Sequence, residues 1–474
     1  MNNNYQQYQI ERKQHWDKVA TSYYKHANLG NSYHQILKFF FKSVVPANKK
    51  VLELGCGEGD LLAALNPSHG VGVDFSPMMI QNARKKHLKL TFIEADIHDF
   101  ELEGTFDYII ISDLLNDLWD VQKTLNNIKK YTSPETKLVF NFFSRVWELP
   151  LHIARKIKLV NPVLKQNWFS MMDVKNILNL TDYEVIKSGS EVLLPFKIPL
   201  ISGILNRFLS KLWLFNLFNL TAILIARPKP VQDLKEAKVS VVVAARNEKG
   251  HIPDIVRRTP EMGKGTELIF IEGGSSDDTW GAIKKVIDDN PDRDIKCAQQ
   301  GGKGKGDAVR KGFSLATGDV LMILDADMTV PPEDLPKFYE AWLTGKAEFV
   351  NGVRLVYPMQ KEAMRFFNLL GNKFFSFAFS WVLGQSIKDT LCGTKVLSRK
   401  NYEIIADNRV FFGDFDPFGD FDLLFGASKI NLKILDLPIR YHARSYGETN
   451  ISRWKHGIIL LRMLVFAARK LKFK

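Results

Sequence analysis

Runs of consecutive apolar residues recur along the chain, and most of them end in glycine or in acidic side chains. The runs cover residues 51–54, 70–73, 106–112, 183–186 and 221–226 in the first half and 239–245, 267–271 and 320–324 in the second. Runs of this length are typical of strands buried on both faces of a parallel sheet. The pattern predicts an α/β protein in which helices separate most of the strands.

Two other segments have helical periodicity. Residues 15–41 are predicted to form a helix. An apolar insertion at about 195–220 repeats large apolar residues over 201–215 at helical spacing, with Arg207 and Lys211 on the other side. We expect an amphipathic helix there, which packs on its own domain or on the second one, or lies on a membrane.

At 474 residues the chain is too long for one hydrophobic core. The proline-rich and polar stretch after residue 226 is typical of a linker. We predict a first domain over residues 1–228, a linker over 229–237, a second domain over 238–454 and a basic amphipathic helix over 455–474.

The net charge of +13 favours anionic partners such as nucleotide phosphates, lipid phosphates and an anionic membrane surface. No aromatic signature of RNA binding accompanies the charge, so nucleic acid is not expected. Cys56, Cys297 and Cys392 are widely separated and lack metal-ligand spacing, as in a reducing compartment. The start of the chain lacks the order of a secretory signal, and no apolar stretch is long enough to cross a bilayer. We expect a cytoplasmic protein, peripheral at the inner face of the membrane.

Three closely spaced glycines, Gly55, Gly57 and Gly59, follow the first predicted strand and precede a helix. This arrangement lets the backbone approach a nucleoside or nucleotide at the end of a strand. Asp74 ends the next strand, at the interval at which an acid reaches ribose hydroxyls. A nicotinamide dinucleotide is the alternative ligand, but the loop lacks the Gly-x-Gly-x-x-Gly spacing that opens toward a pyrophosphate.

The glycine loop, the acid at Asp74, the Ala95-Asp96 element and the strand entered at Phe106-Asp107 together resemble the class I S-adenosylmethionine-dependent methyltransferases over about residues 10–228. The resemblance implies a Rossmann-like domain with S-adenosyl-L-methionine as cofactor. It places the methionine moiety at the glycines, the ribose at Asp74 and the adenine at Asp96 and Ile97. The cofactor contacts so implied are Glu53, Gly55, Gly57, Gly59, Asp74, Phe75, Asp96 and Ile97.

The methyl acceptor is not identified by any residue pattern. No pair of a histidine and a carboxylate stands out as a base, and we consider His98, Asn116 and Asp117 as candidates. His98 is expected to be an ordinary surface residue.

In the second half, the apolar strand at 320–324 leads into Asp325 and Asp327. Two carboxylates at this spacing can both turn toward one hard cation, and Mg²⁺ or Mn²⁺ with oxygen ligands suits them. Such a cation would neutralise a diphosphate. An Asp-x-Asp pair can also be a simple turn or helix cap, so its neighbours decide between the two interpretations.

Three neighbouring segments favour the metal and diphosphate interpretation. Polar residues follow two strands, and a glycine- and lysine-rich loop that opens a helix suits phosphate. The candidate donor contacts are Arg246, Asn247, Glu248, Glu272, Lys305, Asp307 and Asp325.

In order, these segments resemble the family 2 inverting glycosyltransferases over about residues 238–445. The resemblance implies a nucleotide-sugar-binding α/β domain of the GT-A type and a GDP- or UDP-linked donor. The chain has Glu272-Gly273 where the family usually has paired aspartates.

Later segments bear on the sugar acceptor. The loop from Asp389 to Lys395 resembles the acceptor side of the polyprenyl-phosphate sugar synthases, and the segment after Ile439 resembles their phosphate-binding sequence. The resemblance implies acceptor contacts at Asp389 and Lys395, and Arg444 can bind phosphate bidentately. Asn450 replaces the lysine of that sequence.

Asp420 stands where the family has an acidic pair. It would be the base if the acceptor is a sugar hydroxyl. A lipid phosphate is already ionised and needs no base, so Asp420 would then orient or ligate.

These observations predict a bifunctional enzyme that transfers a sugar to a polyprenyl phosphate and a methyl group to an unidentified small molecule or glycan. The alternative is a glycosyltransferase that elongates a polysaccharide, with a first domain that binds without turnover. The helix at 455–474 carries Lys455, Arg462 and Arg469 at heptad spacing, so it either lies on an anionic bilayer or docks on the sheet.

Overall fold

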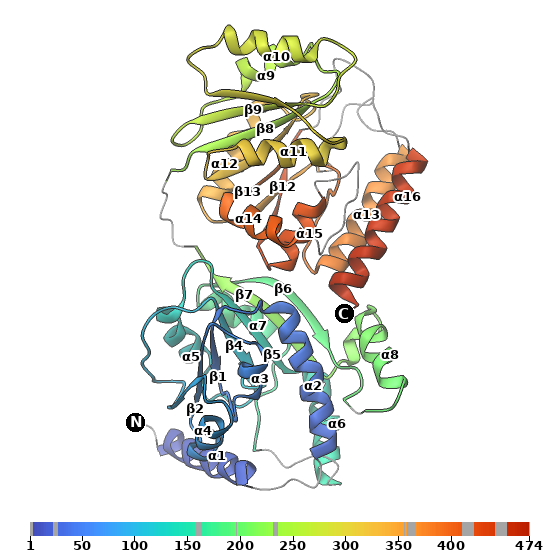
Figure 1. Cartoon of the computed structure of the whole chain (residues 1–474). Coiled ribbons are helices and arrows are strands. Elements are labelled where there is room, and N and C mark those ends of the chain that lie inside the picture. Colours follow the sequence, from blue (N-terminus) through green and yellow to red (C-terminus); the bar gives the residue numbers. More distant parts are fainter. Residues whose placement is uncertain are drawn as a thin grey trace. The chain divides into compact units, whose positions relative to one another are not determined.

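The computed structural model describes residues 3–21, 27–157, 164–195, 197–230, 236–354, 356–357, 366–409, 421–440 and 453–473. The chain forms two compact units that divide between Lys229 and Pro230 (Figure 1).

The first unit is built on a seven-stranded sheet. Its elements are α1 (Asn3–Thr21), α2 (Ala27–Val44), β1 (Lys50–Leu54), α3 (Asp60–Ala64), β2 (His69–Asp74), α4 (Pro77–Lys86), β3 (Thr91–Glu94), β4 (Tyr108–Ser112), α5 (Val121–Ile128), β5 (Lys137–Phe143), α6 (Glu148–Lys156), α7 (Met171–Leu180), β6 (Tyr183–Glu191), α8 (Ile201–Arg207) and β7 (Thr221–Pro228). The strand order is β3-β2-β1-β4-β5-β7-β6, and only β7 runs antiparallel to its neighbours.

Helices cover both faces of this sheet, and each face has its own hydrophobic core. Leu37 and Phe41 of α2 pack on one face, and Val174 and Leu178 of α7 pack on the other. The strands are therefore apolar on both sides, which explains the continuous apolar runs of the sequence. The predicted strands are confirmed, and β6 extends to Glu191.

Two helix predictions in this unit are wrong in extent. The segment expected to be one helix over 15–41 contributes to two, α1 and α2, and the first already begins at Asn3. The amphipathic helix expected over 201–215 ends at Arg207 and is followed by 3-10 turns at Leu209–Lys211 and Asn216–Phe218. The spacing is helical, but the Asn206 side chain donates to the Leu194 carbonyl and the Ser210 hydroxyl to the Asn206 carbonyl where the regular helix has ended.

The second unit is built on another seven-stranded sheet. Its elements are β8 (Val239–Ala245), α9 (Ile252–Arg258), β9 (Thr266–Glu272), α10 (Thr279–Asp288), β10 (Ile295–Gln299), α11 (Gly304–Leu315), β11 (Val320–Asp325), α12 (Leu335–Leu343), β12 (Phe349–Val353), α13 (Phe366–Leu383), β13 (Lys395–Ser398), α14 (Arg399–Asp407), α15 (Phe421–Lys429), β14 (Ile434–Pro438) and α16 (Arg453–Ala467), with a π-helical turn at Ala468–Lys472. The strand order is β10-β9-β8-β11-β13-β12-β14, and β13 is antiparallel to both neighbours.

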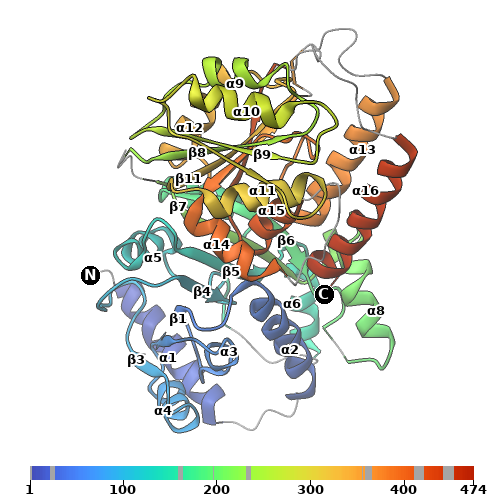
Figure 2. The ribbon, with the colours of Figure 1, turned by 45° about the horizontal axis from the view of Figure 1, so that its top comes forward.

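The C-terminal helix α16 runs alongside α13 (Figures 1 and 2). Leu460 and Met463 are buried on one side of α16, whereas Ile458, Leu461 and Val465 are exposed on another. Among the helices of the described ranges, none is long and apolar enough to span a lipid bilayer.

Candidate functional site

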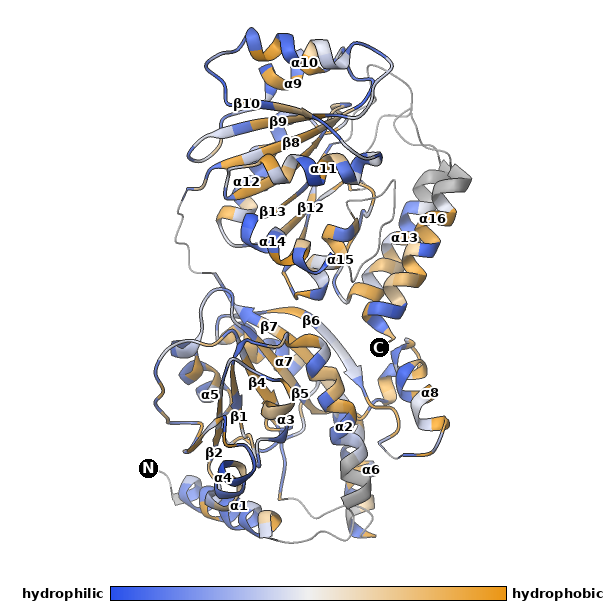
Figure 3. Cartoon of the chain, viewed as in Figure 1, coloured by the Kyte–Doolittle hydropathy of each residue, from blue (hydrophilic) through white to orange (hydrophobic). Residues whose placement is uncertain are grey.

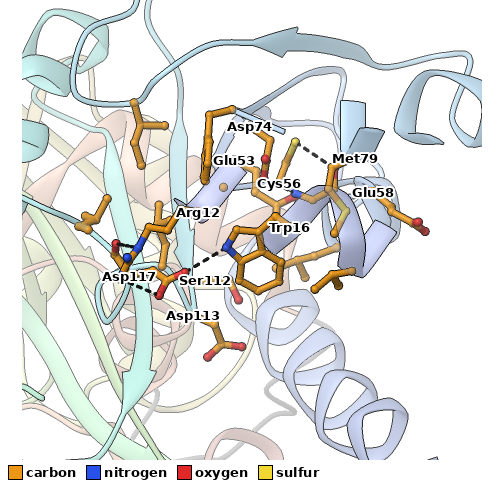
Figure 4. Close-up of a pocket in the computed structure, with 18 of the residues that line it drawn as sticks. Arg12, Trp16, Glu53, Cys56, Glu58, Asp74, Met79, Ser112, Asp113 and Asp117 are labelled. Carbon is orange, nitrogen blue, oxygen red and sulfur yellow. Dashed lines mark hydrogen bonds and ion pairs between the residues drawn. The ribbon is translucent and has the colours of Figure 1, made fainter. Parts of the chain in front are cut away.

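A pocket of about 910 Å³ lies in the first unit at the carboxyl ends of β1, β2 and β4. Helices α1 and α2 contribute to its wall, with Trp16 and Arg12 on the α1 side (Figure 4). The glycine loop, Asp74, Phe75, Asp96 and Ile97 also line it. The structure thus brings together the cofactor contacts that the resemblance implied except Gly59, which is not part of the pocket lining and lies against Phe92.

The glycine loop is held against the second strand. Gly55 and Gly57 have φ values of 66° and 51°, in the left-handed region that residues with a side chain rarely adopt. Asp74 Oδ2 accepts a hydrogen bond from the Gly57 N–H at 2.9 Å, and Oδ1 accepts one from the Ser76 N–H at 2.9 Å. Asp74 therefore fixes the loop and still faces the pocket.

Glu53 is buried beneath the glycine loop, where its Oε2 accepts a hydrogen bond from the Leu62 N–H at 2.9 Å. Burial raises the pKa of this carboxyl to about 8, and the bond from Leu62 only partly opposes the shift. Glu53 thus carries a proton at neutral pH and positions the start of α3.

Asp96 receives four hydrogen bonds. Oδ1 accepts from the backbone N–H of His98 at 2.9 Å and lies 2.7 Å from its ring Nδ1. Oδ2 accepts from the Tyr5 hydroxyl at 2.5 Å and from the Gln9 side chain, both on α1. Burial opposes ionisation, but the bonds from His98 and Tyr5 outweigh it and hold the pKa of Asp96 below its usual range.

Of the three candidate bases, His98 and Asp117 line the pocket and Asn116 does not, and all three are engaged in hydrogen bonds. His98 is buried, so the expectation of a surface residue is wrong, and its Nε2 accepts from the Asp120 N–H at 3.2 Å. Asn116 is buried and bonds to the backbone of Phe143 and Asn167. The Asp117 carboxylate accepts from the Trp16 indole at 3.1 Å and lies near Arg12 (Figure 4).

Asp113 is a pocket residue that the sequence reasoning missed. It follows β4 with φ 53°, and its Oδ1 accepts from the Tyr33 hydroxyl at 2.7 Å and from Asn141 at 2.6 Å. Burial raises the pKa of Asp113. The position of Asp113 directly after an apolar strand was a signal in the sequence. Nothing in the sequence indicated that Tyr33 and Asn141 contact it, because they come from distant segments.

In the second unit, three parallel strands end at one edge of the sheet. Ala245 of β8 pairs with Glu272 of β9, and Asp325 of β11 pairs with Ala244. Because neighbouring strands lie about 4.8 Å apart, Glu272, Asp325 and the Arg246-Asn247 turn lie close together.

Hydrogen bonds shape this edge. Asn247 has φ 58°, and its Oδ1 accepts from the Ser276 N–H at 2.7 Å. Glu248 is buried against His251 Nδ1 at 2.8 Å. Glu272 accepts from the Ser275 N–H at 2.5 Å, and Arg246 is exposed. Arg246 is thus available to a ligand, whereas Glu248 and Glu272 hold the loops.

The glycine- and lysine-rich loop meets the acidic strand end. Lys305 pairs with Asp325, and Asp307 accepts from the Gly302 N–H at 2.9 Å. Burial opposes ionisation of Asp325, but Lys305 outweighs it and lowers the pKa of this carboxyl. A Cβ atom at Gly393 would collide with both Asp325 and Lys305.

Asp327 lies just beyond this strand, where its Oδ1 accepts hydrogen bonds from the Thr329 N–H at 3.2 Å and hydroxyl at 2.8 Å. Within the described ranges, no group of three or more His, Cys, Asp or Glu side chains forms a ready-made metal site. A cation at this edge therefore needs ligands from a bound substrate besides Asp325 and Asp327.

The predicted acceptor residues Asp389 and Lys395 are buried, unlike the exposed Arg246. Asp389 is fully buried and accepts from Arg354 Nε at 2.7 Å and Nη2 at 2.9 Å. Lys395 is also buried and donates to the Cys392 carbonyl at 2.5 Å. Both lie behind the surface rather than on it. Asp420 and Arg444 lie outside the described residues.

Two family models match this chain. Residues 46–185 match a methyltransferase domain, and residues 240–404 match glycosyl transferase family 2. A segment that matches a methyltransferase domain thus precedes a segment that matches glycosyl transferase family 2. Both domains indicate a transferase, and the fold predicted from the sequence is confirmed.

The glycosyltransferase domain has curated relatives. The undecaprenyl-phosphate 4-deoxy-4-formamido-L-arabinose transferase of Enterobacter sp. (strain 638) is 24% identical over 220 residues, 45% of this chain and 63% of that protein. The enzyme of that name from Klebsiella pneumoniae (strain 342) is 34% identical over 107 residues, 22% of this chain and 33% of that protein. This chain spans less than two thirds of the length of either relative.

Solved methyltransferase structures are similar to the first part of the chain. The magnesium protoporphyrin IX methyltransferase of Synechocystis PCC 6803 with bound SAH is 18% identical, covers 48% of this chain and 89% of that chain, and has a TM-score of 0.28. The N-methyltransferase NodS of Bradyrhizobium japonicum WM9 is 15% identical, covers 46% of this chain and 98% of that chain, and has a TM-score of 0.32.

Proposed function

We propose that this chain is a bifunctional enzyme. The glycosyltransferase domain transfers a sugar, with inversion, from a GDP- or UDP-linked donor to a polyprenyl-phosphate lipid. The methyltransferase domain transfers a methyl group from S-adenosyl-L-methionine to a small molecule or glycan. The observation that carries the first activity is the convergence of Arg246, Lys305 and Asp325 at one sheet edge. The named activity of the two curated relatives supports a lipid-phosphate acceptor.

Mg²⁺ or Mn²⁺ suits this edge in its chemistry, because Asp325 and Asp327 offer the hard oxygen ligands that it prefers. When bound, the cation neutralises charge on the leaving diphosphate. Lys305 balances Asp325 and can contact a donor phosphate, and Arg246 can contact another.

The roles of the acceptor-side residues follow from the ionisation of the proposed acceptor, a lipid phosphate. A lipid phosphate is ionised near pH 7, so its attack requires no general base. Arg444 is proposed to bind that phosphate, and Asp420 to orient the acceptor. Asp389 and Lys395 are proposed to support the acceptor loop from beneath, since both are buried.

S-adenosyl-L-methionine fits the first pocket in size and polarity, since the glycine loop, Asp74 and Asp96 line a cavity of about 910 Å³. The cofactor supplies an electrophilic methyl group. Asp74 is proposed to accept hydrogen bonds from the ribose, and Asp96 from the adenine amine.

A peripheral position at the inner face of the membrane belongs to the proposal. Helix α16 exposes Ile458, Leu461 and Val465 together with Arg462, and Arg469 of the turn that follows is exposed as well. A face that combines apolar and basic residues can lie on an anionic bilayer, where the lipid acceptor resides.

The test is transfer of labelled sugar from a panel of UDP- and GDP-sugars to short-chain polyprenyl phosphate with Mg²⁺ or Mn²⁺. We expect a chloroform-soluble labelled product that is lost in Asp327→Ala. Donor hydrolysis without labelled lipid would overturn the lipid-phosphate acceptor and would make Asp420 the base to test on a sugar hydroxyl.

A further inference from the structure

The segment 197–218 of the first unit exposes many of its large apolar side chains to solvent. Ser210 within the segment is fully buried, and Asn219, which directly follows the segment, is 1% exposed. The segment's large apolar side chains face outward, with exposed fractions of 87% for Leu200, 76% for Trp213 and 62% for Leu217. Exposed apolar residues are common singly, but a contiguous set of them marks an interaction site.

Hydrogen bonds keep the segment in this orientation. Asn206 accepts from the Leu194 N–H at 2.8 Å and donates to its carbonyl at 2.7 Å. Asn219 donates to the Ser210 carbonyl at 2.8 Å and to the Ser190 hydroxyl at 2.9 Å. Rotation of the segment to hide its apolar side would break these bonds, which pair the side-chain NH2 groups of Asn206 and Asn219 with fixed acceptors.

The adjacent helix α6 extends the apolar face. The Trp147 indole just before α6 donates to the Phe218 carbonyl at 2.9 Å, which joins the two segments. Val146, just before Trp147, and Leu149 and Ile153 of α6 are exposed. Figure 3 shows hydrophobic residues, in orange, along α8. We call the exposed apolar residues of 146–157 and 197–218 the apolar face.

The charges beside the apolar face are mostly positive, since residues 145–157 include Arg145, Arg155 and Lys156 against one acid, Glu148. Between Val192 and Asn219 the sequence contains Lys197, Arg207 and Lys211 and no aspartate or glutamate. Lys211 pairs with Glu191, which leaves Lys197 and Arg207 as exposed cations. Aromatic residues with flanking cations fit the interface of an anionic bilayer, where the rings enter the headgroup layer.

We propose that the apolar face docks the first unit on the surface of an anionic lipid bilayer. This inference goes beyond the proposed membrane contact of α16, because it rests on residues of the methyltransferase domain alone. The charge pattern favours lipid over a second copy of the chain, which would set the same cations against each other.

The test is co-sedimentation of the full chain with vesicles of phosphatidylcholine and phosphatidylglycerol in equal parts. The double variant Trp213→Ser and Leu217→Ser should bind at least about tenfold more weakly, because two large side chains no longer enter the interface. Leu88→Ser changes an equally exposed residue outside the apolar face and should bind like the unaltered chain. Equal binding by the double variant and the unaltered chain would overturn the proposal.

Two further measurements distinguish a lipid bilayer from a second copy of the chain as the partner of the apolar face. Brominated lipid should quench the fluorescence of Trp213, seen as a difference between the unaltered chain and Trp213→Phe. Leu461→Ser on α16 should leave this quenching in place, so a failure of α16 as a membrane helix is distinguished from a failure of the apolar face. A concentration-dependent dimer that Trp213→Ser abolishes, without quenching by lipid, would assign the face to a second copy instead.

Discussion

Tyr5 donates a hydrogen bond from its hydroxyl to Asp96 Oδ2 at 2.5 Å, across 91 residues of sequence. Gln9 donates to the same oxygen, so helix α1 occupies one side of this carboxylate. In the proposed function the adenine amine binds Asp96. Helix α1 and the adenine therefore compete for one acceptor.

Tyr5→Phe should tighten the binding of S-adenosylhomocysteine. The variant no longer donates to Asp96, so the adenine amine has one competitor fewer for this carboxylate. A gain of about 1 kcal/mol in the binding free energy corresponds to a Kd about fivefold lower. Titration calorimetry measures the change. Tyr8→Phe is the matched control, because the Tyr8 hydroxyl donates to the Asp117 carbonyl and not to Asp96. Unchanged or weaker binding by Tyr5→Phe would contradict the competition.

Glu53→Gln should change the pH dependence of stability. The folded carboxyl has a pKa of about 8 against an ordinary value of 4.5, so between these values the folded state keeps a proton that the unfolded state releases. The free energy of unfolding then falls as pH rises through this range, by at most about 1.4 kcal/mol per pH unit. The calorimetric unfolding temperature of the variant minus that of the unaltered protein should be larger at pH about 8 than at pH about 5. The same pH dependence in both proteins would refute the shift.

Arg354→Ala should destabilise the second unit strongly. Asp389 is fully buried, and Arg354 donates to both of its carboxylate oxygens. Removal of the arginine leaves a buried charge without compensation, which costs about 3–5 kcal/mol. The measurement is urea unfolding. Arg257→Ala removes an exposed pair with Asp254 and should cost less than about 1 kcal/mol. Similar losses in the two variants would argue against a structural role for Asp389.

Gly393→Ala should impair sugar transfer while the fold survives. The added Cβ would displace Asp325 and Lys305, and misplacement of catalytic groups by about 1 Å can cost about a hundredfold in rate. Steady-state transfer rates measure the loss. Gly371→Ala adds a Cβ with no atom within 4 Å and serves as the control. If both variants transfer sugar at the normal rate, Asp325 and Lys305 do not act at the site.

The sequence by itself determined the strands that are continuous apolar runs, such as β1, β8 and β11, and the residues at their ends, but it did not locate β5, β10, β12, β13 or β14. Strands buried on both faces must be apolar throughout, and polar residues at their ends mark the edge where parallel strands finish. The glycine loop, Asp74 and Asp325 could therefore be located as neighbours of predicted strands. These inferences need only residues a few positions apart.

The tertiary structure alone decided which distant residues meet. Asp96 meets Tyr5, Asp325 meets Gly393, and Asp113 meets Asn141 because the sheet order brings their segments together. The apolar spacing of 201–215 predicted a longer helix, but spacing does not reveal which side has a partner. The side-chain NH2 groups of Asn206 and Asn219 bond to carbonyls of the unit, and the loss of such bonds opposes the opposite orientation.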